Sequence, residues 1–409
     1  MSNVNTELLD ASVRHQIYLE RYGTTIAREM LRILISSEKQ AREIFDARIS
    51  RILELGYDQG PRTSKRTDDL IKELAKEIEA ARVEQSLDPL AIAMIDEWAE
   101  EFAEYENGFQ LASLNKATSA ALDATPFAIS FEGVALSQVL GAALAKPFSV
   151  RAGGDAQTLG SWLDGIPDSE RRRIEDAIRG GVVNGETTRD IVRRVFGTIQ
   201  EQKTNKGNAA VIKTRRGVES LVRTAITHIS TVTRDEIYKE NNDLVKGVEW
   251  ISTLDSRTTP VCIKRDGTIY PVDSGPRPPA HIGCRSSTAP KLKSYAELGL
   301  NVTEPEKSTR AYLAIPEKMN VTQYRRELAK QGLTKAQQTQ IISNLSGQTD
   351  AKDWESFLSR QTKDFQETVL GVERTRLYRE GGLTLKQLIA PNDQFYTIDD
   401  LRRLHPDQF

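Results

Sequence analysis

One stretch of the sequence, from Trp250 to Pro290, limits the possible folds more than any other. It holds both cysteines of the chain, together with many β-forming residues, glycines and prolines. Strong β-formers from Val248 to Thr253 predict a strand, and Asp266-Gly267 followed by further β-formers is typical of a hairpin. Residues 286–289 predict a closing strand that ends at Pro290. We therefore expect a small β module built on a proline-rich loop and held between long helical segments.

Helical periodicity dominates the N-terminal third of the chain. Apolar residues recur at helical spacing over residues 1 to about 55, and Gly56, Gly60 and Pro61 interrupt the pattern. A second helix is expected after Thr67 and a third from Pro89 onward. The charged residues between the apolar stripes predict a solvated face, and the alternative is a face that binds a partner. Small side chains over 110–160 indicate a linker or an interface of closely packed helices, with a domain boundary near 125–165.

The central region predicts three further helices. Asp168 and Ser169 are expected to cap a helix that ends at Gly180-Gly181, and Thr187 is expected to cap one that ends at Gly197. A long helix over 218–232 leads directly into the β module. His228 borders its apolar stripe, which favours a hydrogen-bonded, half-buried histidine over a ligand. The basic run 203–216 predicts a solvated loop, and the alternative is contact with DNA or an acidic neighbour.

Short helices continue to the C-terminus. We expect them over 324–328, 336–345 and twice within 354–390, with a docking tail or a frayed helix over 399–405. The fold class is therefore mainly α with a small α+β module, in which long N-terminal helices precede central helices, a short β-sheet and a helical C-terminal tail. The expected segments are a helical arm (1–125), a helical region (126–245), a small β module with the Cys/His loop (246–300) and the helical C-terminal tail (301–409).

Composition excludes several classes of protein. The formal net charge of the 409 residues is −2, so no overall basic field argues for nucleic-acid binding. Two cysteines cannot form a disulfide framework, which favours synthesis in the cytosol. The N-terminus lacks the basic and apolar regions of a signal peptide. The apolar run 139–145 is too short to span a membrane, so we expect no membrane association.

Cys262, His281 and Cys284 have the spacing C-x18-H-x2-C. Thiolate and imidazole ligands suit zinc, so a structural zinc site is one hypothesis. A fourth ligand is needed, and the spacing does not choose among three aspartates of the stretch, Asp255, Asp266 and Asp273. The alternative is two ordinary buried thiols and a histidine that bonds to the backbone. If zinc is present, it would fix a module too small to have a core of its own.

The charged residues of the stretch favour a structural role over catalysis. Asp255 beside Arg257 or Arg285 predicts an ion pair that pins the loop to the strand. The enzyme alternative is a nuclease or transferase that uses Asp255, His281 and Cys284, and it requires these groups to converge in an open cleft. The chain has no phosphate-binding, dinucleotide-binding or nucleophile-elbow motif. We assign structural roles to Trp250, Asp255, Arg257, Asp266, Gly267 and Arg285.

Several of these features occur in a fixed order: Arg223-Thr224 on the preceding helix, the segment 247–258, Cys262, Asp266-Gly267, and the segment 278–286. Together they resemble the phage Mu F-like family of minor head, or head morphogenesis, proteins. The resemblance covers roughly residues 165–290 and, more loosely, 354–381. Members of this family often have a second cysteine directly after the arginine, where this chain has Ser286. This difference removes one ligand from the expected zinc set.

The resemblance implies a virion component without general enzymatic activity. Proteins of this kind associate with the portal and the inside of the procapsid during head assembly, and some are thought to enter the host with DNA. The implied partners are the phage portal protein, the major capsid or scaffolding protein and packaged DNA, with several copies per virion. The implied location is the head interior or portal vertex, and the host cytoplasm during assembly.

Overall fold

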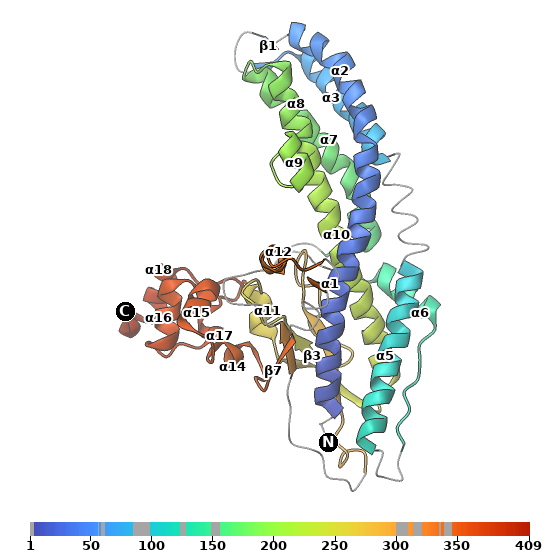
Figure 1. Ribbon diagram of the computed structural model, residues 1–409, viewed down its shortest axis with the longest axis vertical. Helices are drawn as coiled ribbons and strands as arrows, with labels where there is room; N and C mark the ends of the chain where they lie inside the picture. The colour runs from blue at the N-terminus through green and yellow to red at the C-terminus, as the bar shows by residue number, and fades with distance from the viewer. Residues whose placement is uncertain are drawn as a thin grey trace.

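A computed structural model of the chain describes residues 4–55, 57–58, 62–84, 99–122, 128–148, 156–299, 310–313, 321–334, 337–338 and 346–409. It is mainly helical with a small antiparallel sheet, so the predicted fold class is confirmed. Figure 1 shows a long helical body, with the C-terminal helices forming a lobe beside it. The described helices include no segment with the length and hydropathy of a bilayer-spanning helix.

Helix α10 (Ala210–Glu240) connects the two halves of the helical body. Its first turn, with Ala210, Val211 and Ile212, lies in an upper core, and its residues from Val218 to Tyr238 lie in a lower core. A helix of 31 residues is about 46 Å long, so one rigid element spans both cores. The predicted long helix is therefore present and extends beyond both ends of its expected range.

The lower core surrounds the second half of α10. Helices α1 (Val4–Ser36), α5 (Ala99–Leu122) and α6 (Leu136–Ala145) pack against it, and α1 also packs against the sheet. Val139 and Ala143 of α6 are buried in this core. The small side chains of this region thus serve close helix packing, which is one of the two interpretations of residues 110–160.

The upper core lies between the helices of the upper body in Figure 1. It is formed by α2 (Glu38–Leu55), α3 (Lys65–Glu79), the π-helical turn η1 (Ala80–Glu84), α7 (Leu159–Val183), α8 (Thr188–Phe196) and the start of α10. The strands β1 (Tyr57–Asp58) and β2 (Arg62–Thr63) pair between α2 and α3. Thr187 caps α8, which ends at Gly197 with a φ of 81°, as the sequence predicts.

Two predictions for the central helices are wrong. Helix α7 begins at Leu159 with Thr158 as its cap, and it contains Pro167 in its interior, whereas the sequence predicted a start at Asp168. The basic run 203–216 is not a loop, because its ends belong to α9 (Ile199–Thr204) and α10. One of its basic side chains, Arg215, is buried and forms an ion pair with Glu38.

The β module contains a three-stranded antiparallel sheet in the order β4-β3-β5. Strand β3 (Val245–Ile251) pairs with β4 (Ile269–Tyr270) and β5 (Ser287–Leu292). Asp266-Gly267 does not form a tight hairpin turn, because α11 (Pro260–Arg265) lies between β3 and β4 and this dipeptide connects α11 to β4. Strand β5 does not stop at Pro290, which pairs with Val248. Since β5 is an edge strand, the missing N–H of proline is tolerated there.

The C-terminal residues form a compact lobe. It contains α14 (Trp354–Leu358), α15 (Lys363–Leu370), α16 (Val372–Arg379), α17 (Leu385–Leu388), α18 (Ile398–Leu404) and the 3-10 turn η3 (Pro406–Gln408). Its core includes Leu254 and Ile263 of the β module, so the lobe packs on α11. Leu401 of α18 is fully buried, which shows that the segment 399–405 is a packed helix and not a frayed one.

The remaining elements are the paired strands β6 (Arg310–Leu313) and β7 (Ser346–Thr349), and helix α12 (Val321–Lys330). The expected start of a helix at Pro89, and most of the one over 336–345, lie outside the described residues. The four-part division of the chain stays a prediction. Residues of the predicted arm (1–125) and of the predicted helical region (126–245) pack together in both helical cores.

Candidate functional site around the cysteine and histidine loop

The Cys/His cluster, which we define as Cys262, His281 and Cys284, lies where α11 meets the loop before β5. Cys262 is on α11, whose N-cap is Thr259 and whose first residue is Pro260. Helix α10 holds the loop in place through two side chains. Thr224 Oγ1 accepts a hydrogen bond from the Gly283 N–H at 2.9 Å, and Thr227 Oγ1 donates one to the Cys284 carbonyl at 3.3 Å.

The three side chains of the cluster point toward one another. Their donor atoms all lie within 4.8 Å of each other, and they form the one group of metal-ligand type in the described part of the chain. The Cys262 Sγ lies 3.8 Å from the Cys284 Sγ and 3.4 Å from the His281 Nε2. Both cysteines are buried, with 2% and 3% of their surface exposed, and His281 is half-buried. These residues could therefore hold a metal ion away from bulk solvent.

The pKa values of the two thiols are shifted in opposite directions because the thiols interact with each other. Burial opposes ionisation of Cys284, but hydrogen bonds from Cys262 and His281 outweigh it and hold the pKa of that thiol well below its usual value. The hydrogen bond to Cys284 and burial raise the pKa of Cys262 well above its usual value. The two thiols and the imidazole therefore form one group of interacting polar side chains.

A second group of residues holds the module together around Trp250. The indole Nε1–H donates to the Ser252 Oγ at 3.0 Å, and the guanidinium of Arg265 lies over the ring at 5.2 Å from its centroid. The Asp266 carboxylate accepts the Ser252 N–H at 2.6 Å. The Gly267 N–H donates to the Trp250 carbonyl at 2.9 Å. These contacts join the start of the loop to its end.

Asp255 is the centre of an ion-pair group. Arg285 donates to both of its carboxylate oxygens at 2.6 Å, and Arg257 donates through its side chain at 3.2 Å and its backbone N–H at 2.9 Å. Burial opposes the charge, but the hydrogen bonds from Arg285 lower the pKa of Asp255 below its usual value. Since two parallel bonds fix the planes of both groups, the pair ties the loop to the start of β5.

The aspartates expected near the cluster lie elsewhere. Asp255 and Asp266 are engaged as described above, and Asp273 is exposed on the proline-rich loop. The enzyme alternative required Asp255, His281 and Cys284 to converge in an open cleft. Instead Asp255 is paired with Arg285, and Cys284 is buried. No member of the cluster lines the cavity beside α10 or the small pocket next to Thr253.

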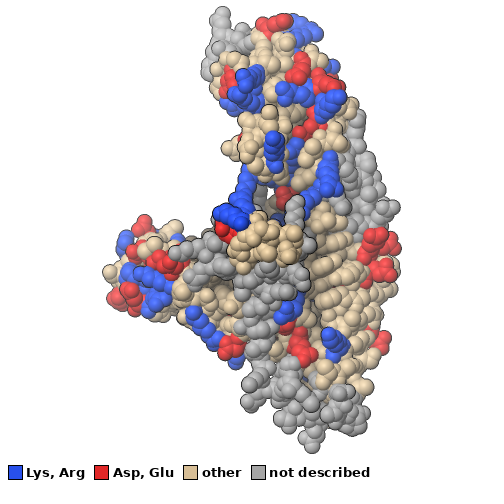
Figure 2. All heavy atoms as spheres, viewed as in Figure 1, with Lys and Arg blue, Asp and Glu red and all other residues tan. Residues whose placement is uncertain are grey.

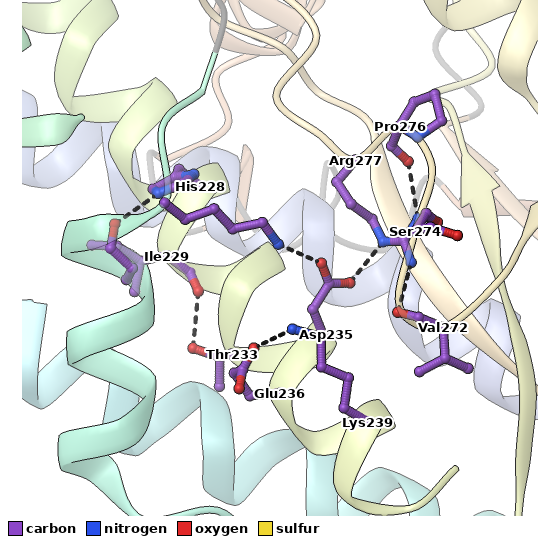
Figure 3. A network of polar contacts seen from close by, with 12 residues as sticks. His228, Ile229, Thr233, Asp235, Glu236, Lys239, Val272, Ser274, Pro276 and Arg277 are labelled. Atoms are coloured by element: carbon purple, nitrogen blue, oxygen red, sulfur yellow. Dashed lines mark hydrogen bonds and ion pairs between the residues drawn. The ribbon is translucent and has the colours of Figure 1, made fainter. Parts of the chain in front are cut away.

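A larger cavity lies beside the cluster, between α10, the proline-rich loop and the C-terminal lobe. Its volume is about 730 Å³. Asp235, one of its lining residues, accepts hydrogen bonds from Lys146 at 2.9 Å and from Arg277 at 2.8 Å. Figure 3 shows Asp235 and Arg277 pointing toward each other. Asp393, another residue that lines the cavity, accepts hydrogen bonds from Lys264 at 2.9 Å and from Arg265 at 3.3 Å. Because these charges neutralise one another, the cavity does not favour a ligand of one charge.

The sequence did not indicate the network around Asp235. Its members come from three segments separated by 89 and 42 residues, so no local spacing brings them together. His228 lies next to this network in Figure 3, and its Nε2 lies 2.9 Å from the Ala143 carbonyl oxygen. Burial lowers the pKa of His228 to about 4, so the ring is neutral and donates a hydrogen bond.

Comparison with known proteins shows that the region around this site is similar to one protein family. The family described as "Phage Mu protein F like protein" matches residues 172–289, from α7 through β5. No curated protein and no solved structure matches the chain. The matched region contains the whole Cys/His cluster, the Trp250 contacts and the Asp255 ion pairs. Residues 172–289 of this chain are therefore similar to the family described as phage Mu protein F-like.

Proposed function

We propose that the chain is a minor head morphogenesis protein of a tailed phage that acts near the portal during procapsid assembly. The observation that carries this proposal is the family match over residues 172–289. The matched region contains α10 and the β module, which join the upper helices, the lower helices and the C-terminal lobe. The family region is thus the part of the chain that positions all the others.

The shape of the chain supports a role in bridging other proteins. The upper helical body and the C-terminal lobe extend from the β module in different directions, so they can reach different neighbours (Figure 1). The lobe is fixed to the module by the ion pairs of Asp393 with Lys264 and Arg265, and by the hydrogen bond from the Trp354 indole to the Thr253 carbonyl at 3.1 Å. A bridging protein needs such rigid connections between its binding surfaces.

The surface charges favour protein partners over DNA. Acidic and basic side chains are intermixed over the upper helices and the lobe on the face seen in Figure 2. The net charge of −2 agrees with this mixed surface. We therefore propose the portal protein and the capsid or scaffolding protein as the main partners. Packaged DNA, the third partner that the family implies, would make contacts secondary to these.

The proposal is tested by isolating procapsids that contain the tagged full-length chain from cells producing the phage. We expect the chain to sediment with the procapsids and to be recovered with the portal protein after the shells are dissociated. Recovery as a free protein, while procapsids form normally without it, would contradict the proposal. Charge reversal of two exposed arginines on α8, Arg189 and Arg193, compared with the same change at Arg402 and Arg403 on α18, tells whether the upper body or the lobe makes the contact.

A further inference from the structure

We propose that Cys262, His281 and Cys284 bind one zinc ion, which locks the loop before β5 onto α11. The proposal rests on the positions of the three side chains and on the contacts that orient them. It is independent of the proposed role in the phage head, because a structural ion is compatible with any function of the module.

Two of the three distances within the cluster match those of a tetrahedral zinc site, and all three donor atoms lie within 4.8 Å of one another. With Zn–S bonds of about 2.3 Å and Zn–N bonds of about 2.1 Å, tetrahedral geometry gives an S···S edge of about 3.8 Å and an S···N edge of about 3.6 Å. The corresponding distances are 3.8 Å between the two sulfurs and 3.4 Å between the Cys262 Sγ and the His281 Nε2. A disulfide would need the sulfurs about 2 Å apart.

The imidazole of His281 is oriented as a ligand. Its Nδ1 lies 3.0 Å from the Ile282 carbonyl oxygen, which can only accept a hydrogen bond, so Nδ1 carries the proton. When the ring is neutral, as it must be to bind a metal ion, its lone pair is on Nε2, which faces the Cys262 sulfur and the Thr259 hydroxyl. A backbone carbonyl that fixes the ring in this way is the usual second partner of a zinc-binding histidine.

Hydroxyl groups occupy the remaining side of the cluster. The Thr259 Oγ1 lies 2.9 Å from the His281 Nε2, and the Thr259 and Ser286 hydroxyls both hydrogen-bond to Cys262. No fourth cysteine, histidine or carboxylate joins the group in the described part of the chain. A water molecule or one of these hydroxyls would therefore complete the coordination, and the Ser286 side chain is placed where a thiol could do so.

The position of the cluster indicates a structural role for the ion. The apolar core around it is small, with Trp250, Val261, Cys262 and Cys284 as its buried members. A metal that joins α11 to the loop would add the stability that so small a core lacks. Because Thr224 and Thr227 bind the same loop, the ion would also fix the module against α10.

The direct test is metal analysis of the full-length chain, expressed with zinc in the medium and purified without a chelator. We expect one zinc ion per chain, and loss of that zinc in Cys262→Ser and Cys284→Ser together with a lower melting temperature. His405→Asn is the matched control, because it removes a histidine from the C-terminal lobe, and it should keep the zinc. Wild-type protein without zinc, or zinc retained in both cysteine variants, would overturn the proposal.

Two further measurements keep the test decisive if the cysteine variants fail to fold. Replacing zinc by cobalt in the wild-type chain should give the charge-transfer absorption of a tetrahedral site with two thiolates, and its absence would count against the site. Ser286→Cys should supply a third thiolate, strengthen that absorption and slow the release of zinc to a chelator. Unchanged absorption and unchanged release in this folded variant would show that the metal is bound elsewhere.

Discussion

Single buried charges in the helical body differ sharply in how well they are paired. Glu106 on α5 is fully buried, and its carboxylate forms hydrogen bonds with four side chains. The partners are His15 at 2.5 Å, Gln110 and Ser230 at 2.9 Å, and Arg234 at 3.0 Å. Burial opposes its charge, but Arg234 and His15 outweigh burial and lower the pKa of Glu106 to about 2. The carboxylate therefore joins α1, α5 and α10 as a charged group.

Replacing Glu106 by Gln should destabilise the chain at neutral pH. The substitution leaves Arg234 buried without its carboxylate, a loss that typically costs about 3–5 kcal/mol. Since the folded pKa lies below the unfolded value of 4.5, this stabilisation is complete above pH 4.5 and is lost as the pH falls toward 2. Urea denaturation at pH 7 measures the effect, with exposed Glu104→Gln on the same helix as control. Equal stability of both variants would contradict this assignment.

Glu170 in the upper core is the opposite case. It pairs with buried Arg82 at 3.0 Å, but Glu38 and Glu79 lie nearby. Burial and these two carboxylates outweigh Arg82 and raise the pKa of Glu170 to about 7, with Arg173 as a weaker favourable charge. The protonated form is therefore favoured in the folded chain at mildly acidic pH.

The pH dependence of stability should reveal this raised pKa. Because the folded pKa exceeds the unfolded value of 4.5, the contribution of Glu170 is complete below pH 4.5 and is lost as the pH rises through 7. The free energy of unfolding of the wild type, relative to Glu170→Gln, should therefore decline between pH 5 and 8. Glu175→Gln, at a half-buried position on the same helix, is the control for the loss of a carboxylate from α7. A constant difference for Glu170→Gln would rule out the raised pKa.

At the scale of secondary-structure elements, the contact between the β module and the C-terminal lobe depends on Gly267. Its φ is 75°, and an added Cβ would lie 3.1 Å from both the Asp353 Cβ and the Lys352 carbonyl oxygen. Only glycine combines this backbone conformation with so close an approach at little cost. The Asp266-Gly267 signal in the sequence thus marks a real turn, although it connects a helix to a strand.

Gly267→Ala should destabilise the chain more than Gly299→Ala. Both positions have a left-handed φ, 75° and 74°, so alanine at either one should destabilise the folded chain by about 1–2 kcal/mol. At Gly299 nothing lies within 4 Å of the added Cβ, whereas at Gly267 the lobe must also move. Thermal unfolding compares the two variants, and limited proteolysis detects a loosened lobe. Equal losses would mean that the lobe does not pack closely on this turn.

The sequence predicted elements well where local signals agree with packing. The cap at Thr187, the end at Gly197 and the apolar face of α10 are all local features, and the structure contains them. The errors at Pro167 and Pro290 have a common cause. Proline normally interrupts helices and strands, but α7 continues through Pro167 and β5 continues through Pro290 at a sheet edge. Tertiary packing allows the helix and the strand to continue through these two prolines, and the local sequence carries no signal of that packing.

In the candidate site, too, the contacts between residues close in sequence could be predicted, and the contacts between distant residues could not. Both cysteines and the histidine lie within 23 residues of sequence, so their spacing suggested a common site, and the structure brings them together. The partner of Asp255 was also within reach of sequence reasoning, because Arg285 closes the same loop. Pairs such as Arg215 with Glu38, which are 177 residues apart, leave no trace in spacing or composition.

At the scale of the whole molecule, α10 and the β module form a rigid connection between the helical body and the lobe. If the chain bridges two components of a phage head, this connection sets the distance and orientation between them. The zinc ion that we propose would strengthen the connection at its smallest core.

The proposed role in the phage head is tested most directly by a reconstruction of the procapsid that includes the portal vertex, determined from particles that carry the full-length chain. We expect density for the long helices α1 and α10 inside the shell near the portal, with the C-terminal lobe against a neighbouring subunit. Absence of the chain from both procapsids and mature virions would contradict the proposed role.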